Sequence, residues 1–175
     1  MEVAVLSDTH SPRFWKRCPA AVAEQLTGVD LILHAGDVCT VEVLDELSGY
    51  APVQVVMGNN DRPEVAAWGA PETLALDIDG LSVAMIHDSG PATGRPARLR
   101  RRFPDADLVV FGHSHIPMDL TDSDGGRACE PDHRALRIFT PGSPTDRRRQ
   151  PAGTLGRLSI DGGRLVEARI IPLPR

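Results

Sequence analysis

The tetrapeptide Gly58-Asn59-Asn60-Asp61 directly follows the apolar run Val53-Gln54-Val55-Val56-Met57. The apolar run predicts a buried strand, which the glycine ends just before a group of side-chain oxygens. Asn59 offers a neutral oxygen ligand of the kind that hard cations accept. Further residues able to bind a metal also follow apolar, strand-like runs: Asp8, His10, Asp37, His87, His113 and His115. Seven such groups at strand ends predict a metal site.

Size and composition are those of an ordinary globular protein. The 175 residues, 41% of them hydrophobic and 25% charged, suffice for one domain over residues 1–175 with a sizeable core. The formal net charge of -5 excludes an overall basic field that would attract nucleic acid or an anionic membrane. The apolar runs have strand length, so we expect no membrane span. Met1-Glu2 leads straight into Val3-Ala4-Val5-Leu6 without a signal-type core, which favours a cytoplasmic location.

The three cysteines, Cys18, Cys39 and Cys129, form neither a Cys-x-x-Cys pair nor a paired framework. A disulfide scaffold is therefore not expected. Cys39 follows Asp37 by two residues and could approach the metals, but a small buried thiol is the commoner role for such a residue.

The first third of the chain alternates between strand and helix patterns. Short apolar runs predict strands over 3–6, 31–33 and 53–57, while helical spacing predicts helices over 19–26 and 41–47. This alternation is typical of a parallel sheet with covering helices.

The pattern changes after residue 70. Segments 74–78 and 81–86 flank Asp79-Gly80, and segments 155–160 and 165–171 flank Asp161-Gly162-Gly163, so each pair predicts a hairpin. A helix over 95–103, strands over 108–111 and 136–139 and an exposed loop over 122–133 complete the prediction. We therefore expect two packed sheets with helices outside, in one α/β or α+β domain.

The spacing of the polar residues suits metal binding. Asp8 and His10 lie two apart and face the same way if the backbone is extended, and His113 and His115 repeat this spacing. Asp37 follows a glycine, which permits a sharp turn, and its two oxygens suit a bridging ligand. Two divalent cations beside two carboxylates leave a net positive site that suits a phosphate anion.

The donor set also indicates the metal and the chemistry. Mixed nitrogen and oxygen ligands without thiolate favour Mn, Fe, Zn, Ni or Co over a soft metal or a Mg-only site. Two metals about 3.5–4 Å apart can hold a bridging water that is deprotonated near neutral pH and directed at phosphorus. A lone Asp-x-His or His-x-His is weak evidence, and His34 is expected to pack or to orient a ligand. The joint occurrence of the motifs predicts a two-metal phosphoester hydrolase.

The series D-x-H, G-D, G-N, H and G-H-x-H resembles the calcineurin-like metallophosphoesterase superfamily. The likeness runs from Asp8 to Pro141-Gly142-Ser143 and is greatest to the short, single-domain YfcE-like phosphodiesterases. The resemblance implies a four-layer α-β-β-α sandwich of two mixed sheets, with the ligands on loops along one edge. It also implies a hydrolase that cleaves small phosphodiesters through a metal-bridging hydroxide, with Mn²⁺ as the first expectation for its two divalent ions.

The resemblance assigns roles residue by residue. One metal would be held by Asp8, His10 and His115, and the other by Asn59, His87 and His113. Asp37 would bridge the two ions. Asp37, Asn59 and His87 are thus the expected catalytic residues.

Two positions depart from the family pattern. Many members have His where this chain has Asn60, and an amide cannot act as a general acid. We therefore hypothesise that the enzyme is limited to activated diesters and is slow on phosphomonoesters. Asp88 stands where the family usually has Gly, and could either orient His87 or be a solvated loop residue.

Substrate contacts are expected from Asn60, Arg62 and Arg13, since a guanidinium binds phosphate oxygens in a bidentate manner. Arg147, Arg148 and Arg149 are expected as a solvated loop near the rim of the site. Arg98 and Arg100–Arg102 are expected on the exposed face of the helix over 95–103.

The sequence leaves several alternatives open. The retromer subunit with this fold is largely a protein-interaction scaffold, but it has lost part of the ligand set, whereas all seven positions are filled here. A phosphomonoesterase is a second alternative. DNA-repair nucleases of the superfamily carry extra regions for which this acidic chain has no room, so no stable nucleic-acid complex is expected. The sequence leaves open which small phosphodiester is the substrate and whether the chain forms a homo-oligomer.

Overall fold

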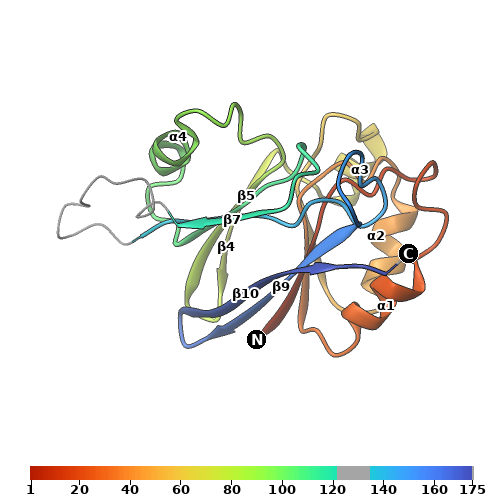
Figure 1. The fold of residues 1–175 in the computed structure, drawn as a ribbon, viewed down its shortest axis with the longest axis horizontal. Coiled ribbons are helices and arrows are strands. Elements are labelled where there is room, and N and C mark those ends of the chain that lie inside the picture. Colours follow the sequence, from red (N-terminus) through yellow and green to blue (C-terminus); the bar gives the residue numbers. More distant parts are fainter. Residues whose placement is uncertain (122–134, 175) are drawn as a thin grey trace.

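The computed structural model describes residues 1–121 and 135–174. Its first sheet has the strand order β10-β9-β1-β2-β3 (Figure 1). The strands of this sheet are β1 (Glu2–Leu6), β2 (Leu31–His34), β3 (Val53–Val55), β9 (Thr154–Asp161) and β10 (Arg164–Pro172). The strands β1, β2 and β3 are parallel, as predicted, and β9 and β10 add an antiparallel hairpin beside β1.

The second sheet has the order β4-β5-β6-β8-β7. Its strands are β4 (Thr73–Ile78), β5 (Leu81–Ile86), β6 (Leu108–Val110), β7 (Met118–Thr121) and β8 (Arg137–Thr140). Strands β5, β6 and β8 run parallel, and β4 and β7 are antiparallel edge strands. The helices are α1 (Ala20–Leu26), α2 (Glu42–Ser48), α3 (Pro63–Trp68) and α4 (Arg95–Arg102).

Three apolar clusters separate four layers. Side chains such as Val22 and Leu44 pack α1 and α2 against one face of the first sheet. A second cluster lies between the two sheets and includes Val5 and Met85. A third cluster joins Leu99 of α4 to the outer face of the second sheet. Figure 1 shows α1, α2 and α3 on one side of the paired sheets and α4 on the other, which confirms the α-β-β-α sandwich.

Both predicted hairpins form. Asp79 and Gly80 have φ values of 51° and 86°, as a two-residue turn between β4 and β5 requires. Gly162 and Gly163 have φ values of 53° and 77° between β9 and β10. Glycine tolerates these left-handed conformations without steric cost, so these turns fix the registers of both hairpins.

Two elements were not predicted from the sequence. Helix α3 has only six residues and starts at a proline, so it spans too few turns for a periodic signal. Strand β7 is a four-residue edge strand without a fully buried residue, so it lacks an apolar run. Strand β3 ends at Val55, two residues earlier than predicted, because the ladder partner β2 ends at His34.

Other expectations concern cysteines and membranes. Cys18 and Cys39 are free thiols, while Cys129 and the expected loop over 122–133 lie outside the described residues. Within the described ranges, every helix is too short or too polar to cross a membrane.

Candidate metal centre

The predicted ligands follow the carboxyl ends of five strands. The loop after β1 carries Asp8 and His10, the loop after β2 carries Asp37, and the loop after β3 carries Asn59. In the second sheet, His87 follows β5, and both His113 and His115 follow β6. Because the parallel strands of each sheet end at one edge, the ligands of both sheets meet at a common edge of the sandwich.

The backbone brings each spaced pair together in an unexpected way. Asp8 and His10 have φ values of 57° and 49°, and His113 and His115 have values of 68° and 58°. The extended backbone that was the condition of the spacing prediction is therefore absent at these pairs. Left-handed conformations of non-glycine residues cost about 1–3 kcal/mol each and persist where the surroundings hold them.

Contacts between the two loops of the first sheet hold this backbone. The amide of Asp8 donates to the carbonyl of Gly36 at 2.9 Å, and the amide of His10 donates to the carbonyl of Asp37 at 3.0 Å. The curled Asp8–His10 segment thus lies bonded along the loop that carries Asp37, which keeps their side chains on one side.

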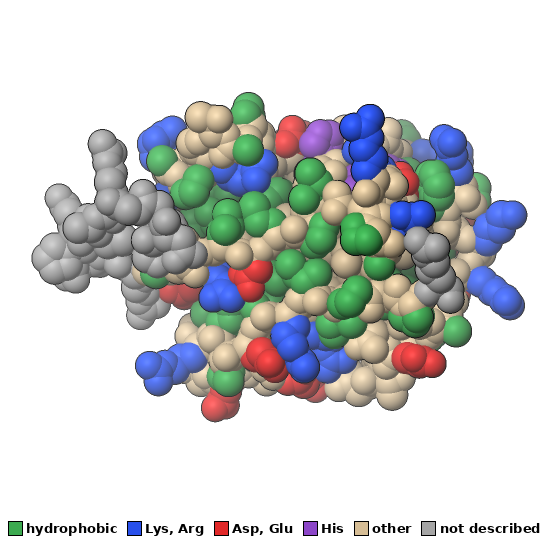
Figure 2. Space-filling view, in the orientation of Figure 1, with side chains coloured by type: hydrophobic (Ala, Val, Ile, Leu, Met, Phe, Trp, Pro, Cys, Tyr) green, Lys and Arg blue, Asp and Glu red, His purple; other side chains and the backbone are tan. Residues whose placement is uncertain are grey.

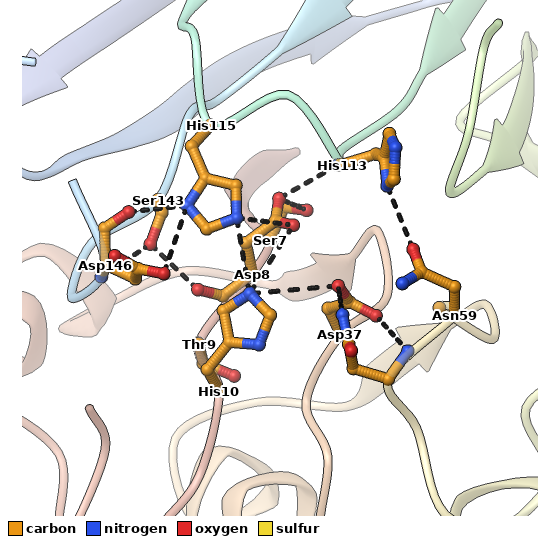
Figure 3. A network of polar contacts seen from close by, with 12 residues as sticks. Ser7, Asp8, Thr9, His10, Asp37, Asn59, His113, His115, Ser143 and Asp146 are labelled. Carbon is orange, nitrogen blue, oxygen red and sulfur yellow. Dashed lines mark hydrogen bonds and ion pairs between the residues drawn. The ribbon is translucent and has the colours of Figure 1, made fainter. Parts of the chain in front are cut away.

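The first ligand group consists of Asp8, His10 and His115 (Figure 3). Asp8 Oδ1 lies 3.2 Å from His115 Nε2 and 3.9 Å from His10 Nε2. The two Nε2 atoms are 3.2 Å apart, and the two rings are stacked with centroids 5.1 Å apart. The three donor atoms therefore converge on one point.

The second group consists of Asn59, His87 and His113. Asn59 Oδ1 lies 2.9 Å from His113 Nδ1 and 3.2 Å from His87 Nε2. The rings of His87 and His113 meet edge to face, with centroids 5.2 Å apart. The second group thus presents one oxygen and two nitrogens.

Asp37 lies between the groups. Its Oδ2 is 3.7 Å from His10 Nε2 and 3.4 Å from His87 Nε2. The sequence places these two histidines in different sheets, so the carboxylate joins the contributions of both sheets. Asp8, Asp37 and His87 also form a buried cluster that could hold an ion.

The donor set fits metal ions. Asp8 is completely buried, and its Oδ2 accepts hydrogen bonds from Ser7 Oγ at 2.5 Å and from the amide of His113 at 3.0 Å. Its Oδ1 has no hydrogen-bond partner among the described residues. A buried anionic oxygen without a partner is costly, and a cation bound there would remove that cost.

Two imidazoles have a defined orientation. His87 Nδ1 contacts the carbonyl of Ala35 at 2.7 Å, and His115 Nδ1 contacts the carbonyl of Asp146 at 2.5 Å. A carbonyl only accepts, so each Nδ1 carries a proton and each Nε2 is turned toward the centre, where it faces oxygens of Asn59 and Asp37 (His87) or of Asp8 (His115). A metal ion bound there would take the place of a proton on Nε2. Neutral imidazole with a free nitrogen is the form that binds metals.

The amino-acid sequence is similar to known phosphoesterases over nearly its whole length. A sequence model of the calcineurin-like phosphoesterase superfamily domain matches residues 1–163. The chain belongs to this superfamily. It is 34% identical over 177 residues to a probable metallophosphoesterase from Methanothermobacter thermautotrophicus, covering 98% of this chain and 92% of that protein. A probable metallophosphoesterase from Methanocaldococcus jannaschii is 32% identical over 177 residues, covering 99% of this chain and 82% of that protein.

Solved structures of low sequence identity share the fold. Vps29 from Entamoeba histolytica, complexed with zinc, superposes with a TM-score of 0.73 at 21% identity, covering 98% of this chain and 97% of that one. A Thermotoga maritima protein gives a TM-score of 0.71 at 24% identity, covering 98% and 99%. Chaetomium thermophilum Vps29 in complex with a cyclic peptide gives a TM-score of 0.68 at 15% identity, covering 99% of this chain and 98% of that one. These neighbours confirm the calcineurin-like phosphoesterase fold, and the family implies divalent metal ions.

Asn60, at the position where many superfamily members have His, contacts Asp37. Its backbone amide donates to Asp37 Oδ1 at 2.8 Å, and its side-chain Nδ2 donates to Asp37 Oδ2 at 2.7 Å. Burial acts to raise the pKa of the Asp37 carboxyl, but the hydrogen bond and charge of His87 and both bonds from Asn60 outweigh it, so this pKa lies below its usual value. Asn60 therefore orients a predicted metal ligand, while its predicted substrate contact stays a prediction.

Asp61, the last residue of the opening tetrapeptide, organises the same loops. Its carboxylate accepts hydrogen bonds from the amides of Gly58 at 2.7 Å, Asp37 at 3.1 Å and Cys39 at 2.6 Å. A Cβ at Gly58 would overlap the Asp37 carboxylate, so this close approach requires glycine. No specific role was predicted for Asp61 from the sequence, because its hydrogen bonds to Asp37 and Cys39 form only in the folded loops.

Two residues after β8 support the first group, and neither of them was assigned a role in the site from the sequence. Ser143 Oγ donates to the carbonyl of Asp8 at 2.8 Å, and Asp146 supplies the carbonyl that orients His115 (Figure 3). The family-like Pro141-Gly142-Ser143 turn was the only signal available. It places the end of β8 beside the loop after β1.

Asp88 and Cys39 make local contacts. Asp88 Oδ1 accepts a hydrogen bond from the amide of Gly90 at 2.7 Å, and Ala35 rather than Asp88 orients His87. Of the two readings, the exposed loop residue is therefore the one supported. Cys39 Sγ lies 3.5 Å from His10 Nδ1, and burial raises the pKa of this thiol to about 11, so it is protonated at neutral pH.

One of the predicted surface arginines, Arg98, differs from expectation. Arg98 is not a free surface residue, because its guanidinium donates to the carbonyls of Ser89, Pro91 and Thr93 and so ties the loop after His87 to α4. Arg13 is exposed over the Phe14 ring, with 5.0 Å from its guanidinium carbon to the ring centroid.

The remaining predicted arginines lie at the surface. Arg62 is exposed at the start of α3, and Arg147, Arg148 and Arg149 are also exposed. Arg148 Nε lies 3.9 Å from Asp146 Oδ2, next to the carbonyl that orients His115. Figure 2 shows histidine atoms at the upper edge of the surface beside Lys or Arg side chains, so the centre can be reached from solvent. Substrate contacts of Arg13 and Arg62 stay predictions.

Proposed function

We propose that this chain is a dinuclear-metal-dependent phosphodiesterase that hydrolyses small phosphodiesters. The observation that carries the proposal is the position of Asp37 Oδ2, within 3.7 Å of His10 Nε2 and 3.4 Å of His87 Nε2. One carboxylate thus joins two groups of ligand atoms, as a site for two cations requires. Membership of the calcineurin-like phosphoesterase superfamily supports the hydrolase class.

The ligand groups define the proposed metal sites. Asp8, His10 and His115 would hold one ion, and Asn59, His87 and His113 the other, with Asp37 shared. When bound, two divalent ions supply Lewis-acid polarisation of the phosphoryl group and make a water nucleophile available at neutral pH. Mn²⁺ is the ion we propose, because imidazole and carboxylate ligands without thiolate suit it.

The chain's own groups fix charge and orientation. Asp8 and Asp37 are both buried, and their two negative charges offset only half of the charge of two divalent ions. The remaining positive charge favours a phosphodiester anion. His87 and His115 are oriented by backbone carbonyls, so they do not have to reorganise when they bind.

Asn60 limits which leaving groups the enzyme can expel. In many superfamily members a histidine here is expected to protonate the departing oxygen, but the Asn60 amide has no such proton to give, and it is bonded to Asp37. The substrate must therefore carry a leaving group that departs without help. This argument favours activated diesters over monoesters and alkyl esters.

The test uses protein freed of metal with a chelator and then reconstituted. With Mn²⁺, we expect two ions per chain by elemental analysis and hydrolysis of bis(4-nitrophenyl) phosphate that exceeds that of 4-nitrophenyl phosphate. Asp37→Asn should lower the diesterase rate by about 100-fold or more, since it removes the shared charge. Asp105→Asn, which changes an exposed carboxylate, should retain the wild-type rate. Two bound ions without hydrolysis of either ester would overturn the proposed activity.

A protein-interaction role is the alternative. It is favoured by the structural neighbour from Chaetomium thermophilum, Vps29, which was solved with a cyclic peptide. The same reconstitution separates the two roles, because a scaffold would bind metal without turning over the diester. A cytoplasmic location also stays a prediction.

A further inference from the structure

A cavity of about 620 Å³ lies directly beside the second ligand group. Asn59, His87 and His113 line one end of it. Small-molecule sites in proteins measure about 300–1,000 Å³ and are mostly preformed. The cavity is therefore large enough for an organic group attached to a phosphate held at the metal centre.

The walls of this cavity combine an apolar floor with charged residues. Met57, Ile86 and Ala70 supply apolar surface, and Ala66 of α3 forms part of the rim. Ile86 ends β5, Met57 lies in the loop after β3, and Ala66 lies in α3, so the cavity lies where the ends of the two sheets meet α3.

The charged lining residues are Glu72, Asp88 and Arg102, all exposed. Arg102, the last residue of α4, is exposed as predicted and also lines this cavity. Two carboxylates against one guanidinium leave a net negative wall. Such a wall repels an added anion and accepts hydrogen bonds from N–H and O–H groups.

We propose that this cavity binds one ester group of the substrate and selects bulky, uncharged groups that carry hydrogen-bond donors. The inference rests on the proposed phosphodiesterase function and adds the substrate class: diesters with one such group rather than two small alkyl groups or a second anionic group. Glu72 and Asp88 accept hydrogen bonds from the group, and the apolar floor covers its ring.

The test uses three diesters with one common leaving group, 4-nitrophenolate. The retained group is methyl, 4-aminophenyl or 4-carboxyphenyl. We expect kcat/KM of reconstituted wild type to be about tenfold higher for 4-aminophenyl than for methyl, since filling an apolar pocket gives discrimination of this order. We expect 4-carboxyphenyl to fall below 4-aminophenyl.

Matched variants separate the cavity from the surface. Ala66→Trp should fill the rim and bring the ratio of 4-aminophenyl to methyl rates close to one. Ala67→Trp changes the neighbouring exposed alanine of α3, which is not among the lining residues, and should keep the wild-type ratio. Glu72→Gln should raise the ratio of 4-carboxyphenyl to 4-aminophenyl rates, and Arg102→Gln should lower it.

Equal rates of wild type on the methyl and 4-aminophenyl esters would overturn the inference while leaving the phosphodiesterase function intact. The inference would also be overturned if Ala66→Trp and Ala67→Trp gave the same ratio of 4-aminophenyl to methyl rates. If no ester is hydrolysed, the proposed function fails and binding decides the inference. In that case, 4-aminophenyl phosphate added to the Zn²⁺-loaded protein should shift the methyl resonances of Met57 and Ile86 in wild type but not in Ala66→Trp. Unshifted resonances in wild type would overturn the inference.

Discussion

Asn60 holds the Asp37 carboxylate by both of its oxygens, with the backbone amide 2.8 Å from Oδ1 and the side-chain Nδ2 2.7 Å from Oδ2. This contact fixes the carboxylate that lies between the two groups of predicted ligands. At this position the chain therefore has a fixed amide, not a titratable ring, in contact with the carboxylate that we propose to be the metal bridge.

Replacing Asn60 by Ala should weaken metal binding. The variant loses the bond to Asp37 Oδ2 but keeps the backbone bond to Oδ1, so the carboxylate gains freedom without losing its charge. Loss of a hydrogen bond to a metal ligand typically costs about 10–100-fold in affinity or activity. Titration of Mn²⁺ against a competing chelator should show a loss in this range, with Asp105→Asn as the unaffected control. An unchanged affinity would show that Asn60 does not position Asp37.

Asn60→His tests the role of the missing acid. The imidazole could protonate a departing alkoxide, while the bond to Asp37 Oδ2 is lost, so absolute rates should fall and the preference for good leaving groups should weaken. Rates for a series of aryl and alkyl esters, plotted against the pKa of the leaving alcohol, should give a shallower slope than wild type. The same slope in both proteins would count against the idea that Asn60 limits the substrate range.

Asp61→Asn should destabilise the fold without changing any predicted ligand. The carboxylate accepts hydrogen bonds from three backbone N–H groups. In this variant the side-chain NH2 group would face at least one of these N–H groups, which would then have no acceptor. An unsatisfied polar group of this kind costs about 1–3 kcal/mol. Urea unfolding of metal-free protein should show this loss. Asp30→Asn, which alters an exposed carboxylate that accepts one backbone bond from Glu2, should change stability by no more than about 0.5 kcal/mol.

Much of the fold followed from hydrophobic patterning, because long apolar runs and glycine turns act locally. The parallel strands β1 to β3 and both hairpins fall in this class. The short helix α3 and the edge strand β7 form through tertiary packing, so no local signal marks them. Neither element could therefore be predicted from the pattern of its own residues.

The site shows the same division. The residue types and their order predicted which side chains meet, but not the backbone that brings them together, since the positive φ values of Asp8 and His10 depend on bonds to another loop. The bonds from Arg98 to the loop after His87 likewise arise only when α4 packs beside that loop. A sequence that predicts a surface arginine cannot show which carbonyls surround it.

His34 should make stability depend on pH in a way that can be isolated. The side chain is fully buried, its Nε2 contacts Thr9 Oγ1 at 3.2 Å, and its Nδ1 has no partner among the described residues. Burial lowers the pKa of His34 to about 3 from an ordinary value of 6.5, and the nearby His87 and His10 add to this effect, while Asp8 and Asp37 oppose it.

The sign follows from proton counts. Between pH 3 and pH 6.5 the unfolded chain holds a proton on His34 and the folded chain does not, so stability rises with pH in this window. The stabilisation is fully present above pH 6.5 and is lost as the pH falls through the window, by up to about 1.4 kcal/mol per pH unit. His34→Gln has no titrating group at this position, so its free energy of unfolding should fall less steeply from pH 6.5 to 4.5.

The comparison must be one of slopes, because the other histidines titrate in both proteins and the substitution itself will lower stability at every pH. Urea unfolding of metal-free protein at intervals across pH 7.5 to 4.5 gives both curves. Their difference is the pH-dependent contribution of His34, including its interactions with the neighbouring His and Asp side chains. Parallel curves would mean that His34 takes up a proton in the folded state as readily as in the unfolded chain, which its burial among the ligand loops argues against.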